Sequence, residues 1–175
     1  MALTKNLGVK MLKKLSINVL CFVFALAGLG IASAAEWPDA LIKEVEALKA
    51  AGKDKKDMPP TIAGVKNITG DEIKKMMDEK KKFVLLDNRL KADYDKEHIT
   101  GAVLFTVDEL LKNPKLANTY KKDDVLINYC NGVKCWRSPA AALLLKHLGF
   151  KNIYWYRDGL PDWIKKDYPT TEGKK

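Results

Sequence analysis

The segment VLINYCNGVKCWRSPAAALLLKHLG, residues 125–149, decides the fold of this chain. It opens with five mainly apolar residues, a pattern that is typical of a strand buried inside a sheet. Cys130 follows directly, and after a short loop the alanine- and leucine-rich residues 140–148 predict a helix. The pair Ser138-Pro139 suits the start of that helix, with the serine as N-cap, and the final glycine suits its end. The segment therefore predicts a strand, a loop and a helix, with a cysteine where the strand ends.

The loop between this strand and this helix has the character of an anion site. The free N–H groups and the dipole at a helix N-terminus favour negative charge. The same field lowers the pKa of a thiol, and the thiolate is the reactive form of cysteine. Residues 125–157 contain no Asp or Glu, whereas they contain five cations, Lys134, Arg137, Lys146, Lys151 and Arg157. We therefore expect an anion beside an ionised Cys130.

Four motifs, in order along the chain, resemble those of rhodanese-like domains, the single-domain sulfurtransferases. The loop resembles the family's active-site loop, in which a strand-end cysteine carries a sulfane sulfur. Residues 84–89, VLLDNR, resemble a hydrophobic run followed by D-x-R, and residues 97–102, EHITGA, resemble G-H-I-x-G-A. Residues 158–163, DGLPDW, with Tyr168-Pro169 behind them, resemble the closing G-G-x-x-x-W…Y-P. The likeness covers about residues 61–170.

The alternation of elements along the chain agrees with the fold that the resemblance implies. Residues 83–86, 102–105 and 152–156 predict further strands, and capping-box patterns at residues 69–72 and 106–109 predict helix starts. Strands that alternate with helices indicate a mostly parallel sheet, here of about five strands, with helices on both faces. We expect a three-layer, rhodanese-like α/β fold. Ligands of such sheets bind beyond the carboxyl ends of the strands, where Cys130 falls.

The resemblance implies a sulfurtransferase whose site is the whole loop. Cys130 is the expected nucleophile, which attacks the outer sulfur of thiosulfate or a similar small anionic donor, releases sulfite and keeps a persulfide. A thiophilic acceptor, such as cyanide, a thiol or a protein, then takes the sulfur, and no metal or organic cofactor is required. Asp87 and Arg89 are expected to form a structural pair near the site. The expected substrate-binding residues are Asn131, Gly132, Val133, Lys134, Cys135, Trp136 and Arg137.

Two features depart from the common form of this loop. More residues separate Cys130 from Arg137 than in common single-domain rhodaneses, and a second cysteine, Cys135, precedes Trp136. The resulting C-x-x-x-x-C-W-R form is similar to that of a subset of exported rhodanese-like proteins. Cys135 either resolves a persulfide on Cys130 or protects its thiol reversibly, forms a disulfide with it, or fills the loop.

The N-terminus predicts export. Residues 1–35 have a basic start, an apolar stretch and small residues for cleavage near Ala34 or Ala35, the pattern of a secretory signal peptide. We expect a mature protein in a bacterial periplasm without stable membrane insertion; the alternative is a membrane anchor formed by an uncleaved segment. Cleavage removes four lysines and no acid, so the net charge falls from +9 to +5. Nucleic acid is not an expected partner, because no arginine-rich stripe with interleaved aromatics is present.

The remaining chain divides around the rhodanese-like domain. Residues 36–60 predict a helix, over residues 36–51, followed by a polar linker. This helix either packs on the domain, which spans residues 61–170, or engages a partner. Residues 171–175 are expected as a polar tail.

Three other functions fit parts of the sequence. One alternative is a cysteine phosphatase or arsenate reductase, since some phosphatases share this fold and use a longer loop. Against it, Tyr129 stands where a histidine would precede the cysteine, and no nearby acid is evident to protonate a leaving group. A periplasmic thiol redox protein would work through Cys130 and Cys135. A non-catalytic binding module would need neither thiol.

Overall fold

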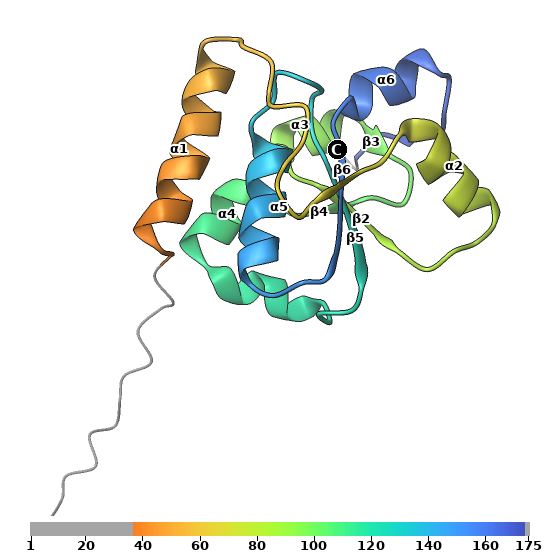
Figure 1. Cartoon of the computed structure of the whole chain (residues 1–175). Coiled ribbons are helices and arrows are strands. Elements are labelled where there is room, and N and C mark those ends of the chain that lie inside the picture. Colours follow the sequence, from red (N-terminus) through yellow and green to blue (C-terminus); the bar gives the residue numbers. More distant parts are fainter. Residues whose placement is uncertain (1–36, 174–175) are drawn as a thin grey trace, which may run out of the picture. The chain divides into compact units, whose positions relative to one another are not determined.

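The structure is a computed structural model that describes residues 37–173. Its centre is a five-stranded sheet in which every neighbouring pair of strands is parallel, in the order β1-β6-β5-β2-β4 (Figure 1). A separate antiparallel pair is formed by β3 and β7. The strands are β1 (Lys66–Asn67), β2 (Val84–Asp87), β3 (His98–Ile99), β4 (Val103–Leu104), β5 (Val125–Tyr129), β6 (Asn152–Tyr156) and β7 (Thr170–Thr171). The α/β fold with a mostly parallel five-stranded sheet, predicted from the sequence, is confirmed.

Helices cover both faces of this sheet, as expected. One face carries α1 (Asp39–Lys53), α4 (Val107–Lys112) and α5 (Arg137–His147), and the other carries α2 (Gly70–Asp78) and α6 (Gly159–Lys165). The short helix α3 (Lys91–Lys96) and the 3-10 helix η1 (Pro114–Thr119) complete the connections. The capping box predicted at the start of α2 is present, since Thr69 and Glu72 bond each other's backbone N–H groups.

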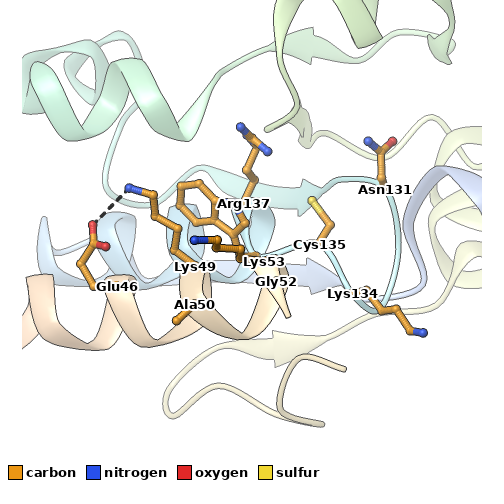
Figure 2. A pocket seen from close by; sticks show the side chains of 10 residues that line it. Glu46, Lys49, Ala50, Gly52, Lys53, Asn131, Lys134, Cys135 and Arg137 are labelled. Carbon is orange, nitrogen blue, oxygen red and sulfur yellow. Dashed lines mark hydrogen bonds and ion pairs between the residues drawn. The ribbon is translucent and has the colours of Figure 1, made fainter. Parts of the chain in front are cut away.

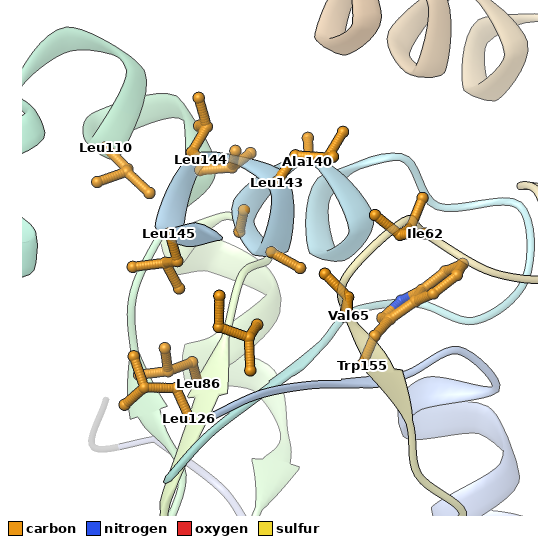
Figure 3. Close-up of a cluster of buried hydrophobic side chains, with 14 of the residues drawn as sticks. Ile62, Val65, Leu86, Leu110, Leu126, Ala140, Leu143, Leu144, Leu145 and Trp155 are labelled. Atoms are coloured by element: carbon orange, nitrogen blue, oxygen red, sulfur yellow. The ribbon is translucent and has the colours of Figure 1, made fainter. Parts of the chain in front are cut away.

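Helix α5 lies at the centre of the larger hydrophobic core. Every residue from Ser138 to Leu145 is buried, because the helix packs on the sheet and is covered in turn by α1 and α4 (Figure 3). A helix that is apolar on all sides is stable only in such a buried place. Because α5 is held on all sides, the N-terminus that it presents to the loop is fixed in position.

Helix α1 and the linker behind it pack on the domain. Val45 and Leu48 of α1 join the core cluster, and Trp37 Nε1 donates to the Leu111 carbonyl at 2.8 Å. In the linker, Met58 is buried and its N–H donates to the carbonyl of Val133, in the loop after β5, at 2.7 Å. Helix α1 and the linker after it therefore stabilise the position of the loop that follows β5.

Some expectations fall outside the described residues. The signal peptide expected over residues 1–35, with its alternative as an uncleaved anchor, lies there. Within residues 37–173, no helix is both long and apolar enough to cross a membrane. Of the polar tail expected over residues 171–175, Thr171 belongs to β7 and residues 174–175 are not described.

Candidate active site

The loop of residues 130–136 connects the carboxyl end of β5 to the N-terminus of α5. Side chains alternate between the two faces along β5, so that Leu126 lies in the cluster under α5 and Tyr129 in the cluster on the other face. Cys130 continues this alternation and returns to the α5 side. Its side chain therefore lies beneath the first turn of α5 and is only 1% exposed.

The thiol of Cys130 is held by groups of the fold. Its sulfur lies 2.8 Å from Ser138 Oγ and donates to the backbone carbonyl of Cys135 at 3.3 Å. Ser138 Oγ also accepts a hydrogen bond from Trp155 Nε1 at 2.9 Å. Burial raises the pKa of the Cys130 thiol well above its ordinary value, which differs from the expectation that the loop holds this thiol ionised. Ser138 does not cap the helix, because α5 begins at Arg137, two residues before the predicted start, with Trp136 as N-cap and no side-chain cap.

Cys135 has the environment that the sequence assigned to Cys130. The side chain of Cys130 is the largest cause that lowers the pKa of Cys135. Burial opposes the shift, whereas the backbone N–H groups of Arg137 and Asn131 and the charge of Arg137 add to it, and the pKa falls to about 7. Both cysteines are free thiols.

A pocket of about 750 Å³ opens beside Cys135. Figure 2 shows the Cys135 sulfur pointing toward the space between the side chains of Asn131 and Arg137. The loop and the N-terminal helix share the lining, which consists of Asn131, Lys134, Cys135, Trp136 and Arg137 on one side and Glu46, Lys49, Ala50, Gly52 and Lys53 on the other. Five of the seven predicted substrate-binding residues therefore line the pocket.

The other two predicted substrate-binding residues shape the loop. Gly132 is buried and has a φ of +91°, a left-handed conformation that favours glycine. An added Cβ there would lie 3.1 Å from the Asp158 carbonyl oxygen. Val133 presents its carbonyl to Met58 of the linker. Neither residue is among those that line the pocket.

Arg137 is positioned by an acid that the sequence did not reveal. Its Nε donates to Asp108 Oδ2 of α4 at 3.0 Å, while its guanidinium lies 5.1 Å from the centre of the Trp136 ring. No hydrogen bond joins its two terminal amino groups to the part of the protein that the structure describes, so both remain available to an anion in the pocket. Such a planar fork suits sulfonate and carboxylate oxygens. Lys134 is exposed at the rim of the pocket.

Trp136 joins the loop to α1. Its side chain is buried in the same cluster as Val45 and Leu48, and its Cδ1 would lie 3.0 Å from a Cβ added to Gly52. The ammonium group of Lys49 lies 5.8 Å from the ring centre. This tryptophan therefore fixes the helix that forms the far wall of the pocket.

Asp87 and Arg89 form a buried ion pair, with Arg89 NH2 at 2.6 Å from Asp87 Oδ2. The hydroxyl of Tyr129 donates to the same carboxylate at 2.6 Å, whereas Arg89 donates to Asn131 Oδ1 at 3.4 Å and to the Glu97 carbonyl at 2.6 Å. Burial works against the charge of Arg89, but Asp87 outweighs it and the pKa of Arg89 is raised. The pair ties the end of β2 to the first residue of the loop after Cys130.

Comparison with known protein families gives one match, to the rhodanese-like domain, over residues 69–166, which is more than half of the chain. Among curated proteins, the putative sulfur carrier protein YrkF of Bacillus subtilis is 29% identical over 104 residues, or 59% of this chain and 54% of that protein. The uncharacterized protein YibN of Escherichia coli K12 is 28% identical over 111 residues, or 63% of this chain and 75% of that protein. The chain thus spans about half the length of the first of these relatives.

Solved structures show the same fold. The BH2092 protein of Bacillus halodurans matches with a TM-score of 0.56 at 20% identity, over 73% of this chain and 85% of that one. A thiosulfate sulfurtransferase of Pseudomonas aeruginosa matches with a TM-score of 0.53 at 16% identity, over 77% of this chain and 24% of that one. Helix α1, which forms one wall of the pocket, lies outside the region matched by the family. By this match and this fold, the chain belongs to the rhodanese-like domain family.

Proposed function

We propose that this protein is a sulfurtransferase that carries a sulfane sulfur as a persulfide on Cys135. The observation that carries the proposal is the position of this thiol. It lines an open pocket, and its neighbours lower its pKa to about 7. Membership of the rhodanese-like family and the similarity to a putative sulfur carrier support sulfur as the transferred group.

This proposal gives to Cys135 the role that the sequence assigned to Cys130. A reacting thiol must meet its substrate, and Cys130 is 1% exposed, whereas Cys135 lines the pocket. A reacting thiol must also ionise, and burial raises the pKa of Cys130 while its neighbours lower that of Cys135. Access and ionisation therefore favour the same residue.

Transfer takes place in two displacements. The thiolate of Cys135 attacks the outer sulfur of thiosulfate or a similar anionic donor, the S–S bond of the donor breaks, and sulfite leaves with the electron pair. The free amino groups of Arg137 and the N–H groups at the start of α5 stabilise the negative charge on the leaving group and on the persulfide. A thiol, a protein or cyanide then attacks the outer sulfur, and the Cys135 thiolate leaves.

The surroundings of the pocket favour an anionic donor. Lys53 and Lys134 add positive charge at its mouth, while Lys49 is paired with Glu46 at 3.4 Å. A volume of about 750 Å³ exceeds what thiosulfate needs, and the space left accommodates a thiol acceptor larger than cyanide. We further propose that the protein works in the periplasm as an exported variant of the family, on the strength of the signal-peptide pattern in residues 1–35. N-terminal sequencing of protein from that compartment tests the cleavage site.

The decisive experiment is thiosulfate:cyanide sulfur transfer by the wild type and two matched variants, Cys135→Ser and Cys130→Ser. We expect Cys135→Ser to lose turnover and Cys130→Ser to keep the ability to form a persulfide. Turnover retained by Cys135→Ser and lost by Cys130→Ser would return the nucleophile to Cys130. Hydrolysis of phosphate esters, with no sulfur uptake from thiosulfate, would replace the sulfurtransferase by a phosphatase that uses Asp108 or Glu46 as its acid.

A further inference from the structure

The proposed transfer leaves a buried nucleophile unused, the thiol of Cys130. We propose that Cys130 is a resolving thiol, which attacks the inner sulfur of the Cys135 persulfide and releases the outer sulfur as hydrosulfide. This inference rests on the proposed function and adds a second product to it. The protein would then deliver sulfane sulfur to an acceptor that enters the pocket, or sulfide when none does.

The loop brings the two cysteines together. The Cys135 N–H donates to the Gly132 carbonyl at 2.9 Å, which closes a tight turn over residues 132–135. This turn, made with the left-handed conformation of Gly132, folds Cys135 back over the end of β5. Its carbonyl oxygen accepts a hydrogen bond from Cys130 Sγ at 3.3 Å, so the two residues are in direct contact.

A chain of donors orients the Cys130 thiol. An indole N–H can only donate, so Ser138 Oγ is the acceptor in its bond with Trp155. The hydrogen of the Ser138 hydroxyl is then free to point to Cys130 Sγ, 2.8 Å away, and the hydrogen of the Cys130 thiol is directed to the acceptors of Cys135. The sulfur of Cys130 is thus held next to Cys135, in a place that substrates in the pocket do not reach.

The step balances without an added oxidant. The proton of Cys130 first passes to the outer sulfur of the Cys135 persulfide, and the resulting Cys130 thiolate attacks the inner sulfur to give the Cys130–Cys135 disulfide and hydrosulfide. The S–S bond within the persulfide breaks, the disulfide bond forms, and the proton of Cys130 moves to the departing sulfur. The outer sulfur is reduced to sulfide while the two cysteine sulfurs are oxidised to the disulfide. A dithiol reductant from outside then restores both thiols.

Burial of Cys130 also sets the order of events. The protonated, inaccessible thiol does not compete with Cys135 for the donor, because the thiolate is the nucleophilic form. Cys130 can attack only a sulfur that is bound to Cys135, the cysteine that it contacts. We therefore expect loading to precede resolution, and a loaded protein without an acceptor to convert slowly into the disulfide.

The test follows the fate of sulfur in the full chain. The reduced protein is loaded with thiosulfate in the absence of oxygen, freed of donor, and incubated without acceptor. Samples are alkylated and cut with a lysine-specific protease, which separates the cysteines because Lys134 lies between them. Cys130 then lies in residues 123–134, and Cys135 in residues 135–146, so mass spectrometry shows a gain of one sulfur on the second peptide or a disulfide between the two.

In the wild type we expect the sulfur on residues 135–146 to disappear as the linked peptides appear, with one sulfide released per disulfide. Cys130→Ser keeps a hydroxyl donor but cannot resolve, so its persulfide should persist. A wild-type persulfide as stable as that of Cys130→Ser, or equal sulfide release by both, would overturn the inference.

A second loading separates the inference from the proposed function. Failure to load from thiosulfate counts against the proposed function alone, and polysulfide then replaces thiosulfate as the loading agent for the same measurement. If neither agent places sulfur on Cys135, the resolving role is refuted as well.

Discussion

Replacing Cys130 by alanine removes the contact that most lowers the pKa of Cys135. A hydrogen bond to a charged group contributes about 1.5–3 kcal/mol. One pKa unit corresponds to about 1.4 kcal/mol. The pKa of Cys135 should therefore rise by about one to two units, from about 7 toward the ordinary value of 9.0. At pH 7 the thiolate share of Cys135 would fall from about a half to about a tenth or less.

The assay is the rate at which iodoacetamide alkylates Cys135, measured on residues 135–146 between pH 5 and pH 10. Because only the thiolate reacts, the wild-type rate should level off above about pH 8, whereas that of Cys130→Ala should still be rising there. Cys130→Ser is the matched control, since its hydroxyl still donates, and its profile should stay close to that of the wild type. A Cys130→Ala profile that superposes on the wild type, in a variant with an unchanged circular dichroism spectrum, would refute this account of the thiolate.

Three further predictions concern the pocket and its support. Arg137→Ala should lower kcat/KM for thiosulfate by about ten- to a hundredfold, because it removes charge-assisted hydrogen bonds to the donor. Lys53→Glu and Lys134→Glu should raise KM for thiosulfate with little change in kcat, and the effect should fade at high ionic strength because the charges are exposed. Asp87→Asn should lower the free energy of unfolding by about 3–5 kcal/mol, measured in urea, since it leaves the Arg89 charge buried without its partner.

Each of these predictions has a matched control. Arg137→Lys keeps the charge but loses the fork, so a variant with full activity would show that charge alone suffices. Lys53→Gln separates the loss of a positive charge from the addition of a negative one, and an unchanged KM in all rim variants would remove these lysines from donor binding. Lys91, an exposed residue on α3, provides the stability control for Asp87→Asn. Equal stability of Lys91→Gln and Asp87→Asn would contradict a supporting role for the buried pair.

The fold was predictable because strands and helices alternate with clear start and stop residues along the chain. The position of the loop followed from this alternation, and so did its relation to the carboxyl ends of the strands. The burial of Cys130 did not follow from treating it as part of the loop, and its predicted role as the nucleophile remains to be tested against Cys135. The signal was present in the strand itself, since Cys130 continues the face that Leu126 occupies under α5. That period of two already directs the side chain inward.

Other parts of the site had no local signal. Asp108 reaches Arg137 from α4, and the lysines of α1 reach the pocket from a segment that no motif connects to the loop. These contacts depend on how helices pack around α5, and packing between distant segments is not encoded in the spacing of residues along one of them. Ser138 had a clear local signal that the structure does not follow. The sequence favours it as a helix cap, but its side chain bonds the buried thiol of Cys130 instead.

Helix α1 forms a wall of the pocket but does not carry the thiol, so substrate selection and sulfur chemistry depend on different parts of the chain. The sulfur proposed to react lies within residues 69–166, the region that matches the rhodanese-like family, whereas the opposite wall of its pocket is contributed by a stretch that precedes this region in the chain. Exchange of that stretch for another would alter which molecules gain entry and leave the sulfur chemistry in place. The sulfur chemistry of the loop and the substrate selectivity of the pocket can therefore be changed independently of each other.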